Sequence, residues 1–495
     1  MKNILKWAQP IIQAAISLLL LVLLVSSGFL PMKYLGIAVV LVLLFLLISF
    51  LTARSDRIAT RSLGAVLAVV VCIILIVASV FLHQVMNTLN QVSGTETQID
   101  NIVVIVNESD PAQAIQDTYG YAFGYFEGQD EEYLEETLSE ISSLNGDADL
   151  SVTPYESSLV LANALLSGEV DAMICNMAYT ALLEDAIADF TTITRIISEK
   201  QFESPVHTVI KDAEGADAPD APDAPNASVD KEISYTEDSY NILISGIDVS
   251  GPINTTSRSD VNIIMTVNPR THTIQLTTTP RDYFVKIPGV SGNQRDKLTH
   301  AGVYGVHSSM RTLQNLYGIE IQDYIRINFD SLVQLVDALG GIDVNSEVEF
   351  DSGGDNHFVK GINHLNGEQA LYFSRTRSGF ADGDNQRGRN QMLVLTGIID
   401  KLQSPALLKN PTGVLDVVSR SMQTSVSSSN ISKVIAWQLD NPKGWTINRQ
   451  SVTGTDDHQE TFSMPGTEFY VMWPDEQDVK NARDTIRQVM KEEPQ

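Results

Sequence analysis

The stretch YNILISGID, residues 240–248, decides the fold of the second half of this chain. Its apolar run is typical of a buried strand, and Asp248 stands where the strand ends. Two further strands are predicted over residues 261–267 and 273–279, and together these elements predict a mixed sheet covered by helices. The same patterns place helices at about 301–316, 331–339, 365–372 and 387–402, a strand at 324–328, a strand-rich part from about 431, and a last helix near 478–491.

Five short clusters of arginine and aspartate flank these elements within residues 248–391. Arginine offers a planar fork of donors that matches phosphate oxygens, and carboxylates are hard oxygen ligands for divalent cations. Together they are what holding a diphosphate and a metal ion requires. The clusters are Asp248, SRSD at 257–260, PRD at 280–282, SRTR at 374–377 and DNQRGRNQ at 384–391.

Asp248 and Asp260 are the candidate metal ligands. Asp248 closes the first predicted strand, Asp260 precedes the second, and the loop between them is rich in Gly, Pro, Ser and Thr. Such a loop could bring both carboxylates to one place, with phosphate oxygens and waters completing the octahedron that Mg²⁺ prefers. Mn²⁺ is the alternative ion, and the structural alternative is that both residues only cap turns.

Arg281 follows the third predicted strand, and the loops after adjacent strands are where sheets of this kind assemble sites. We therefore expect Arg281 to face the same crevice as the two carboxylates. Asp282 beside it could hold the guanidinium in place. The alternative is an ordinary surface salt bridge.

The last two clusters have spacings that align their side chains. Arg375 and Arg377 are two residues apart, which puts both on one face of an extended segment. Arg387 and Gln391 are four apart, so a helix beginning near residue 385 presents both on one face and offers its N-terminus to an anion. Individually these residues read as surface charges; in a chain this acidic, their combination favours an anion site.

The first 82 residues predict a membrane region. Three apolar runs without charge, at about 11–30, 35–51 and 63–82, are long enough to cross a bilayer as helices. A signal peptide is the alternative for the first run, but no small-residue cleavage site follows it. Cations precede the first run and lie between the second and third, whereas only Lys33 follows the first. This bias predicts a cytoplasmic N-terminus and an exterior location for everything after about residue 83.

Composition divides the remainder into parts. The chain carries a net charge of −28, and because residues 1–82 carry +5, the rest carries −33, which argues against nucleic-acid binding. Alternating strand and helix patterns predict a small α/β accessory domain at 98–210. The predicted organisation is a membrane region with neck (1–97), the accessory domain, an acidic Ala/Pro/Asp linker (211–235) and a main domain (236–495) with its motif core at 240–400.

A nucleophile for covalent catalysis is not evident. Cys72 lies in the third apolar run and Cys175 in the accessory domain, and neither has a histidine partner or metal-ligand spacing. The arrangement instead favours in-line transfer to an external hydroxyl, assisted by a metal and arginines. The histidines are scattered and read as surface or turn residues: His272, His300, His307, His357 and His364.

The order of these motifs resembles the LytR-CpsA-Psr family of bacterial cell-envelope enzymes. Besides the clusters named above, the resemblance rests on KLTHA at 297–301, VDALGGIDV at 336–344 and LNGEQAL at 365–371, and it covers about a third of the chain. Three membrane spans and an extra exterior module are similar to the capsule-linked branch of that family. The resemblance implies an α-β-α domain with a central mixed sheet.

The resemblance also implies a reaction and a location. A glycopolymer, capsular polysaccharide or a teichoic-acid-like polymer, would move from a polyprenyl-diphosphate carrier to peptidoglycan, forming a phosphodiester and releasing polyprenyl phosphate. This would take place at the outer face of the cell membrane of a Gram-positive-type bacterium, with capsule assembly proteins as further partners. A polyprenyl-diphosphate hydrolase and a non-catalytic lipid-binding regulator of capsule assembly are the alternatives.

Roles follow from the resemblance by matching motif. Asp248 and Asp260 would bind Mg²⁺, and Arg281, Asp282, Arg375 and Arg377 would be catalytic. Some family members have Arg at the place of Asn390, where this chain has Arg389 as the neighbouring residue. The residues that would grip the diphosphate are Arg258, Arg281, Lys297, Arg375, Arg377, Arg387 and Gln391.

Overall fold

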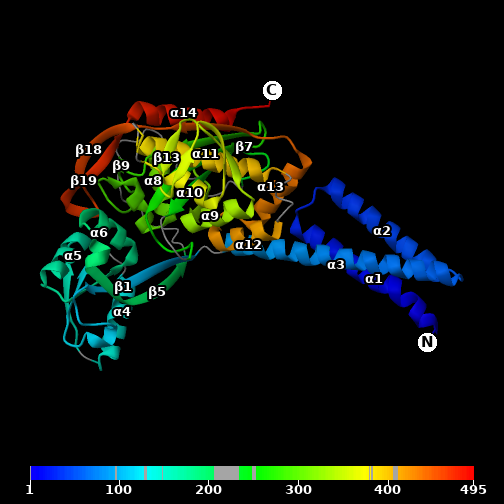
Figure 1. The fold of residues 1–495 in the computed structure, drawn as a ribbon, viewed down its shortest axis with the longest axis horizontal. Coiled ribbons are helices and arrows are strands. Elements are labelled where there is room, and N and C mark those ends of the chain that lie inside the picture. The colour runs from blue at the N-terminus through cyan, green and yellow to red at the C-terminus, as the bar shows by residue number, and fades with distance from the viewer. Residues whose placement is uncertain are drawn as a thin grey trace.

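The computed structural model of this chain has three parts, a bundle of long helices, a small domain and a large domain (Figure 1). The helices project from one side of the large domain, and the small domain lies at its other end. Asp248 and most of the predicted linker lie outside the described residues. The structure describes residues 2–94, 97–127, 131–147, 149–205, 233–247, 252–377, 379–380, 383–404 and 411–494.

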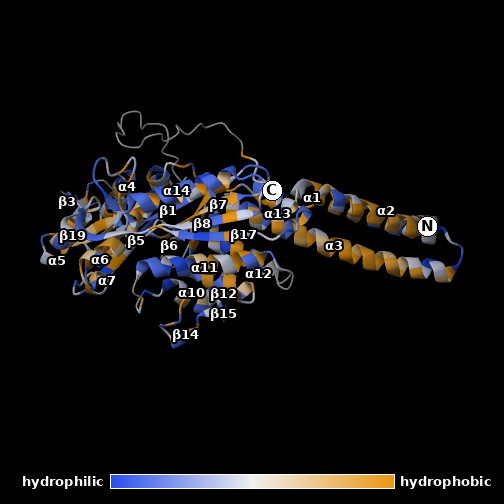
Figure 2. Cartoon of the chain, turned by 90° about the horizontal axis from the view of Figure 1, so that it is seen from above, coloured by the Kyte–Doolittle hydropathy of each residue, from blue (hydrophilic) through white to orange (hydrophobic). Residues whose placement is uncertain are grey.

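The bundle consists of α1 (Lys2–Ser27), α2 (Met32–Arg54) and α3 (Ile58–Gly94). All three are long and apolar enough to cross a membrane, and their surfaces are apolar over most of their length (Figure 2). The third helix continues 12 residues past the predicted end of its span at residue 82, so the predicted neck is mostly helical. Leu89 and Val92 are buried, and this packing extends the helix beyond its membrane-like section.

The bundle packs directly on the large domain through α12 (Pro411–Ser421) and α13 (Ser428–Asp440). Leu82 and Leu89 of α3 form a cluster with Phe29, and Ile431 of α13 packs against it. Lys33 at the start of α2 pairs with Asp440 at 2.5 Å. The α1–α2 turn therefore lies at the same end of the bundle as the large domain.

The small domain is an α/β unit whose five-stranded sheet has the order β3-β2-β4-β1-β5. The two long strands at one side, β1 and β5, pair antiparallel along their whole length. Buried aliphatic side chains such as Val103 and Val104 point to opposite faces, toward two separate clusters. The elements are β1 (Thr97–Asn107), β2 (Ala122–Phe126), α4 (Glu131–Leu144), β3 (Ser151–Tyr155), α5 (Ser158–Ser167), β4 (Ala172–Asn176), α6 (Thr180–Ala186), α7 (Phe190–Ile193) and β5 (Thr194–Pro205), with 3-10 turns at Ile115–Asp117 and Met177–Tyr179.

The large domain is built on a six-stranded mixed sheet of order β16-β11-β6-β7-β8-β17, which confirms the predicted fold class. The stretch that opens the domain forms its central strand β6 (Tyr240–Ile247), antiparallel to β7 and parallel to β11. The other strands of this sheet are β7 (Ser259–Asn268), β8 (Thr273–Thr278), β11 (Asp323–Asn328), β16 (Met422–Thr424) and β17 (Thr446–Ser451).

Helices cover both faces of this sheet. Leu243 packs in the cluster shared with α8 and α14, whereas Ile242 and Ile244 pack in the cluster that includes Met392 of α11. This alternation is what a strand buried on both faces requires. The helices are α8 (Val306–Tyr317), α9 (Phe329–Ala338), α10 (Gly367–Arg375), α11 (Asp384–Leu402) and α14 (Glu476–Lys491), with a 3-10 turn at Leu298–Tyr304. The two-stranded sheets pair β9 (Phe284–Val285) with β10 (Asp296–Lys297), β12 (Ile342–Ser346) with β15 (Gly361–Leu365), β13 (Phe350–Ser352) with β14 (Asn356–Phe358), and β18 (Gly454–Thr461) with β19 (Met464–Pro474).

The segment predicted to be strand-rich from about residue 431 differs from its prediction only at its start; the strands β17, β18 and β19 and the last helix α14 follow as predicted. The part expected to be strand-rich from about Ile431 lies inside helix α13 until Asp440, and α12 precedes it. Ser427 caps α13 by accepting a bond from the Asn430 amide. The helix completes its burial against α3 of the bundle, a long-range contact that local patterning does not reveal.

The small domain is docked on the large one. The Ile99 amide of β1 donates to the Asn254 carbonyl at 2.9 Å, and the Thr256 amide donates back to the Ile99 carbonyl at 2.9 Å. Val303 and Met464 of the large domain complete one of the small domain's hydrophobic clusters. The two domains therefore share a core, which holds α6 next to the β18–β19 hairpin.

Candidate functional site

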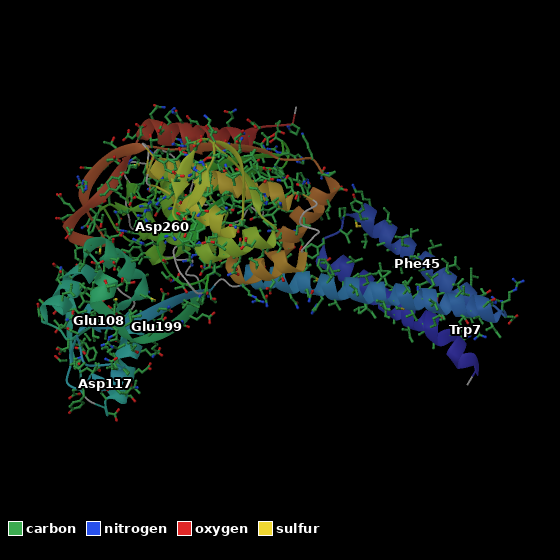
Figure 3. All side chains as sticks on the ribbon, in the orientation of Figure 1. Trp7, Phe45, Glu108, Asp117, Glu199 and Asp260 are labelled. Atoms are coloured by element: carbon green, nitrogen blue, oxygen red, sulfur yellow. The ribbon has the colours of Figure 1, made fainter. Side chains whose placement is uncertain are left out.

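Arg281 lies at the centre of the site. Its Nη1 donates to Asp260 Oδ1 at 3.0 Å, and its Nε lies 3.5 Å from Asp282 Oδ2. Because β7 and β8 are antiparallel neighbours, the start of β7 and the segment after β8 lie side by side at the edge of the sheet formed by the strand ends. This pairing brings Asp260 and Arg281 together, near the small domain, where Figure 3 labels Asp260.

Asp260 is held in its charged form. Burial alone would raise the pKa of this carboxyl, but Arg281, Arg258 and a hydrogen bond from Thr299 Oγ1 at 2.9 Å lower it below its usual value. Burial likewise opposes the charge on Arg281, yet the neighbouring carboxylates, first of all Asp260, raise its pKa. A buried guanidinium at this sheet edge is therefore permanently cationic.

Lys297 reaches the same place from the β9–β10 hairpin. Its Nζ lies 3.2 Å from Asp282 Oδ1, and both side chains are buried. The Asp282 carboxylate thus has a cation on each side, Arg281 and Lys297, and it holds both in position.

Asp296, His300 and Ser463 form a buried network next to Lys297. His300 Nδ1 lies 2.6 Å from Asp296 Oδ1 and 2.8 Å from Ser463 Oγ. Because aspartate and serine meet the same ring nitrogen, the histidine cannot pass a proton from one to the other as in a hydrolase triad. The network fixes the loop that carries Lys297. His300 lies in the 3-10 turn at Leu298–Tyr304, as a turn histidine should, but it is buried and not at the surface.

The start of helix α11 supplies the other half of the site. Arg387 Nη2 binds Asp384 Oδ1 at 2.6 Å, and Arg377 Nε lies 3.5 Å from the same oxygen. The helix lies so close to the end of β8 that a Cβ on Gly388 would come within 3.1 Å of the Thr278 side chain. This close approach leaves little room for a larger residue at position 388 and brings Arg387 against the sheet edge.

Two groups at this helix start lack hydrogen-bond partners among the described residues. The Arg387 Nε, a donor, and the Asn385 Oδ1, an acceptor, are both buried, and unpaired buried polar atoms are costly. Burial, followed by the charge of Asp282, raises the pKa of Asp384 to about 6, although Arg377 and Arg281 oppose the shift. The helix start therefore presents one unpaired donor, one unpaired acceptor and an unusually basic carboxylate.

These residues surround two adjoining cavities that share Arg281 and Asp384. The smaller is polar and narrow, with a volume of about 10 Å³, and the larger, of about 430 Å³, opens to solvent. The smaller is lined by Thr278, Thr279, Pro280, Arg281, Asp384, Asn385, Arg387, Gly388, Gln391, Ser451 and Val452. The larger is lined by Asp185, Arg281, Asp282, Lys297, Arg377, Gly383, Asp384, Phe469 and Tyr470.

Most of the predicted site residues meet here. Arg281 lines both cavities, Arg387 and Gln391 line the smaller one, and Asp260 is bonded to Arg281. The remaining residues that the structure brings together are Asp282, Lys297 and Arg377, all lining the larger cavity.

Two predicted arginines lie elsewhere. Arg375 is the last residue of α10 rather than part of an extended segment, and its guanidinium stacks on the Phe329 ring at 4.5 Å. Arg258 donates instead to the small domain, at 2.6 Å to Asp185 Oδ2 and 3.2 Å to the Ala181 carbonyl. Neither residue lines either of the two cavities described above, and because Arg375 ends a helix, the expected extended face shared by Arg375 and Arg377 is not formed.

Helix α11 shows which neighbouring side chain occupies the inner position. Asn390 is fully buried; its Oδ1 accepts a hydrogen bond from Gln386 Nε2, and its Nδ2 donates to the Phe373 carbonyl. Arg389 turns away from the cavities and donates to Gln386 Oε1 at 2.6 Å, with Glu347 at 3.8 Å. Arg389 therefore does not replace the arginine that some family members have at the place of Asn390.

Several residues of the site carried no usable sequence signal. Asp185 lies in the small domain, and Phe469 and Tyr470 lie near the end of the chain, far from the arginine clusters. Their type and spacing are ordinary, and only tertiary docking brings them to the cavity. Asp384 was part of a recognised cluster, but its role depends on its burial.

The chemistry of Asp260 suits a hard divalent cation. Both of its hydrogen bonds are accepted by Oδ1, and none of the described residues donates to Oδ2. Since its pKa is lowered, an anionic oxygen is available as a ligand. No three His, Cys, Asp or Glu side chains within the described ranges are grouped to hold an ion, so ligands from a phosphate or from Asp248 would have to complete the shell.

Comparison with known proteins covers the large domain. A sequence model of the LytR_cpsA_psr family matches residues 206–485. The polyisoprenyl-teichoic acid–peptidoglycan teichoic acid transferase TagU of Enterococcus faecalis is 34% identical over 253 residues, which cover 50% of this chain and 81% of that protein. Biofilm regulatory protein A of Streptococcus mutans is 33% identical over 224 residues, 42% of this chain and 55% of that protein.

A solved structure of Bacillus subtilis TagV is 26% identical, with a TM-score of 0.43, over 52% of this chain and 99% of that one. The family match spans more than half of the chain and includes all the cavity-lining residues except Asp185. The large domain, which follows the three apolar helices, carries the family's motifs, and the chain therefore belongs to the LytR_cpsA_psr family.

Proposed function

We propose that this chain transfers a glycopolymer from a polyprenyl-diphosphate carrier to a hydroxyl of peptidoglycan. The observation that carries the proposal is that Arg281 and Arg387 both line the smaller cavity, so that two guanidinium groups converge on one polar site. The Arg387 Nε has no partner among the described residues, and a phosphate oxygen would satisfy it. The name of the Enterococcus relative, a teichoic acid transferase acting from a polyisoprenyl carrier to peptidoglycan, supports the same reaction class.

The proposed step is an in-line displacement at phosphorus. The acceptor hydroxyl oxygen forms a bond to the phosphorus that carries the sugar, and the bond from this phosphorus to the bridging oxygen breaks. Polyprenyl phosphate leaves with the electron pair, and the sugar becomes joined to peptidoglycan through a phosphodiester. Arg281, Arg387 and Arg377 would neutralise the charge that develops on the phosphoryl oxygens.

Asp384 is the base that we assign to the acceptor proton. It lies where the two cavities adjoin, so an acceptor entering through the larger one would meet it beside the phosphate. A carboxylate with a pKa of about 6 is better matched to neutral pH than an ordinary aspartate. The Asp384 carboxylate would accept the proton of the acceptor hydroxyl as the new bond to phosphorus forms.

We expect opposite pH trends for binding and transfer. Below pH 6 Asp384 becomes neutral, so Arg377 and Arg387 are no longer neutralised by its negative charge. Because these arginines then attract an anion more strongly, a polyprenyl-diphosphate analogue should bind roughly threefold to tenfold more tightly at pH 5.0 than at pH 7.5. Transfer should fall over the same range because the base is protonated. Titrations and rate profiles of the full chain in detergent check both trends. Asp384→Asn should abolish the binding trend and slow transfer about 10²-fold or more; an unchanged binding trend in this variant would exclude Asp384 as the group responsible.

Mg²⁺ would be held by Asp260, with Asp248 as the second protein ligand that the motif implies. When bound, the ion would supply positive charge to the diphosphate oxygens. We expect chelation with EDTA to abolish transfer and added Mg²⁺ to restore it. Asp260→Asn should raise the Mg²⁺ concentration for half-maximal activity about tenfold or more. Full activity of the wild-type chain in EDTA would contradict a metal role.

We infer capsular polysaccharide as the polymer and the exterior face of the membrane as the place. The three helices keep the enzyme beside a lipid-bound donor, and the cation bias of their ends sets the orientation. The small domain, which lies outside the family match, distinguishes this chain from the matched part of the teichoic acid transferase. Capsule assembly proteins are the partners that this assignment implies.

Wall analysis in cells tests the polymer assignment. Peptidoglycan would be purified from cells that have this chain, lack it, or carry a double Arg281→Ala, Arg387→Ala variant at equal protein level. We expect capsular sugars to be lost from the wall in the latter two. A selective loss of polyol phosphate would instead indicate a teichoic acid, and unchanged wall polymer would overturn the proposed function.

A further inference from the structure

The small domain forms part of the wall of the larger cavity. Asp185 of α6 lines this cavity together with Lys297, Tyr470 and the site residues of the large domain. The family match begins at residue 206, so Asp185 belongs to the part of the chain that the matched family does not include. The wall is therefore incomplete without a domain to which the family motifs assign no role.

Asp185 is fixed where it is by specific contacts. Its Oδ2 accepts a bond from Arg258 Nη1 at 2.6 Å, and the same nitrogen donates to the Ala181 carbonyl one turn earlier in the helix. The Arg258 side chain is only 12% exposed, whereas that of Asp185 is 42% exposed. One face of the carboxylate is thus committed to Arg258, and the rest of the group faces the opening.

The docking of α6 is rigid enough to place this carboxylate. Tyr179, directly before α6, is buried and hydrogen-bonded to Tyr304 of the large domain. The paired bonds between Ile99 and the 254–256 segment hold β1 next to Arg258. A residue on a docked helix that shares a core with the large domain is positioned as firmly as one of the large domain itself.

The lining of the larger cavity suits a sugar. Phe469 and Tyr470 contribute apolar surface against which the C–H groups of a pyranose could pack, and Asp185 is a carboxylate acceptor for its hydroxyls. Each cation that lines the larger cavity has a carboxylate beside it, since Lys297 and Arg281 contact Asp282 and Arg377 contacts Asp384, so this cavity favours a neutral polar group such as a sugar over a second diphosphate. The volume of about 430 Å³ is large enough for a sugar residue adjoining the phosphates.

We propose that Asp185 of the small domain is a specificity-determining residue, which accepts a hydroxyl hydrogen bond from the sugar next to the diphosphate. The inference rests on the proposed function, because it names the sugar-binding wall of that same site. The sugar has two possible sources, the first residue of the donor polymer or the acceptor residue of peptidoglycan. The small domain thereby takes part in choosing which saccharide is joined.

The test compares Asp185→Asn with Asp149→Asn in the full chain in detergent micelles. Asp149 is an exposed aspartate of the small domain away from the cavity lining, so it controls for the charge change. The probes are polyprenyl diphosphate with and without an attached disaccharide, followed by binding, and peptidoglycan oligosaccharides, followed by KM. Thermal unfolding is measured alongside, and Asp185→Glu, which keeps the charge but moves it, replaces the asparagine variant if that unfolds.

We expect Asp185→Asn to reduce the preference for the sugar-bearing over the sugar-free lipid roughly threefold to tenfold if the donor is the source. A similar rise of KM for peptidoglycan alone would identify the acceptor. Unchanged preference and KM would overturn the inference, and so would an equal loss for both lipids, because that would mean that Asp185 acts on the diphosphate through Arg258. Lipid binding is measured without turnover, so the preference between the two lipids can be determined even if the wild-type chain shows no transfer. A wild-type chain without transfer would refute the proposed function, independently of the result for Asp185.

Discussion

Replacing Arg281 with alanine is expected to reduce glycopolymer transfer by about 10²–10³-fold or more. Arg281 is the residue that lines both cavities and contacts two buried carboxylates, Asp260 at 3.0 Å and Asp282 at 3.5 Å. Its removal takes away a diphosphate donor and leaves those carboxylates near each other with less compensation. The measurement is the initial transfer rate of the purified full chain with a polyprenyl-diphosphate oligosaccharide.

Loss of folding has to be separated from loss of chemistry in this variant. Breaking a buried ion pair costs about 3–5 kcal/mol, so the unfolding temperature of Arg281→Ala should fall. Arg281→Lys keeps the charge but not the forked geometry, and we expect it to remain folded while transfer stays severely reduced. Arg420→Ala is the control, because Arg420 is exposed and paired only along its own helix with Asp416 among the described residues. Normal transfer by a folded Arg281→Lys would show that a point charge is sufficient.

Replacing Arg387 with alanine should have the second largest effect, because this buried side chain combines an ion pair with an unsatisfied donor facing the smaller cavity. We expect affinity for polyprenyl diphosphate to fall about tenfold to a hundredfold, with transfer falling at least as far. The readout is binding of a sugar-free polyprenyl diphosphate, which isolates the diphosphate contact.

Helix α11 offers a matched control for this experiment. Arg389 is on the same helix two residues later, but it contacts Gln386 and Glu347 rather than the cavity. Arg389→Ala should therefore bind the lipid within about twofold of wild type, since partly exposed ion pairs contribute little. Equal losses in the two variants would indicate that the general charge of α11, and not the position of Arg387, determines binding.

The contacts at the ends of neighbouring strands could be predicted from the sequence better than the residues that surround the site. Asp260 and Arg281 meet because neighbouring antiparallel strands bring the start of one to the end of the next, and strand patterns are local signals. Arg387 and Gln391 share a helix face for an equally local reason. These relations require no knowledge of the tertiary structure.

What the sequence did not predict depends on packing between distant segments. Arg258 matches the family motif, yet Asp185 of a separately formed domain binds it, and no spacing rule connects the two residues. Arg375 was placed in an extended segment, but the capping of α10 by Asn366 and the burial of Phe373 extend the helix through it. The α13 helix is likewise stabilised by the membrane bundle, whose proximity is a property of the fold.

The membrane bundle and the small domain contact different parts of the large domain, and both affect how substrates reach the site. The bundle contacts the large domain through α12 and α13, whereas the small domain borders the larger cavity through α6. A lipid-linked donor and a wall acceptor therefore have to meet at a site that both the large and the small domain enclose. We expect this arrangement to restrict which saccharides reach Asp384 and the arginines.

The most direct test of the central claim is the chemistry of the product. The purified full chain would be incubated with a polyprenyl-diphosphate oligosaccharide, peptidoglycan fragments and Mg²⁺, and all products identified by mass spectrometry and phosphorus NMR. We predict one polyprenyl phosphate released for each oligosaccharide joined to peptidoglycan through a phosphodiester. Release of polyprenyl phosphate and free sugar phosphate, with peptidoglycan unmodified, would contradict the account and identify a hydrolase.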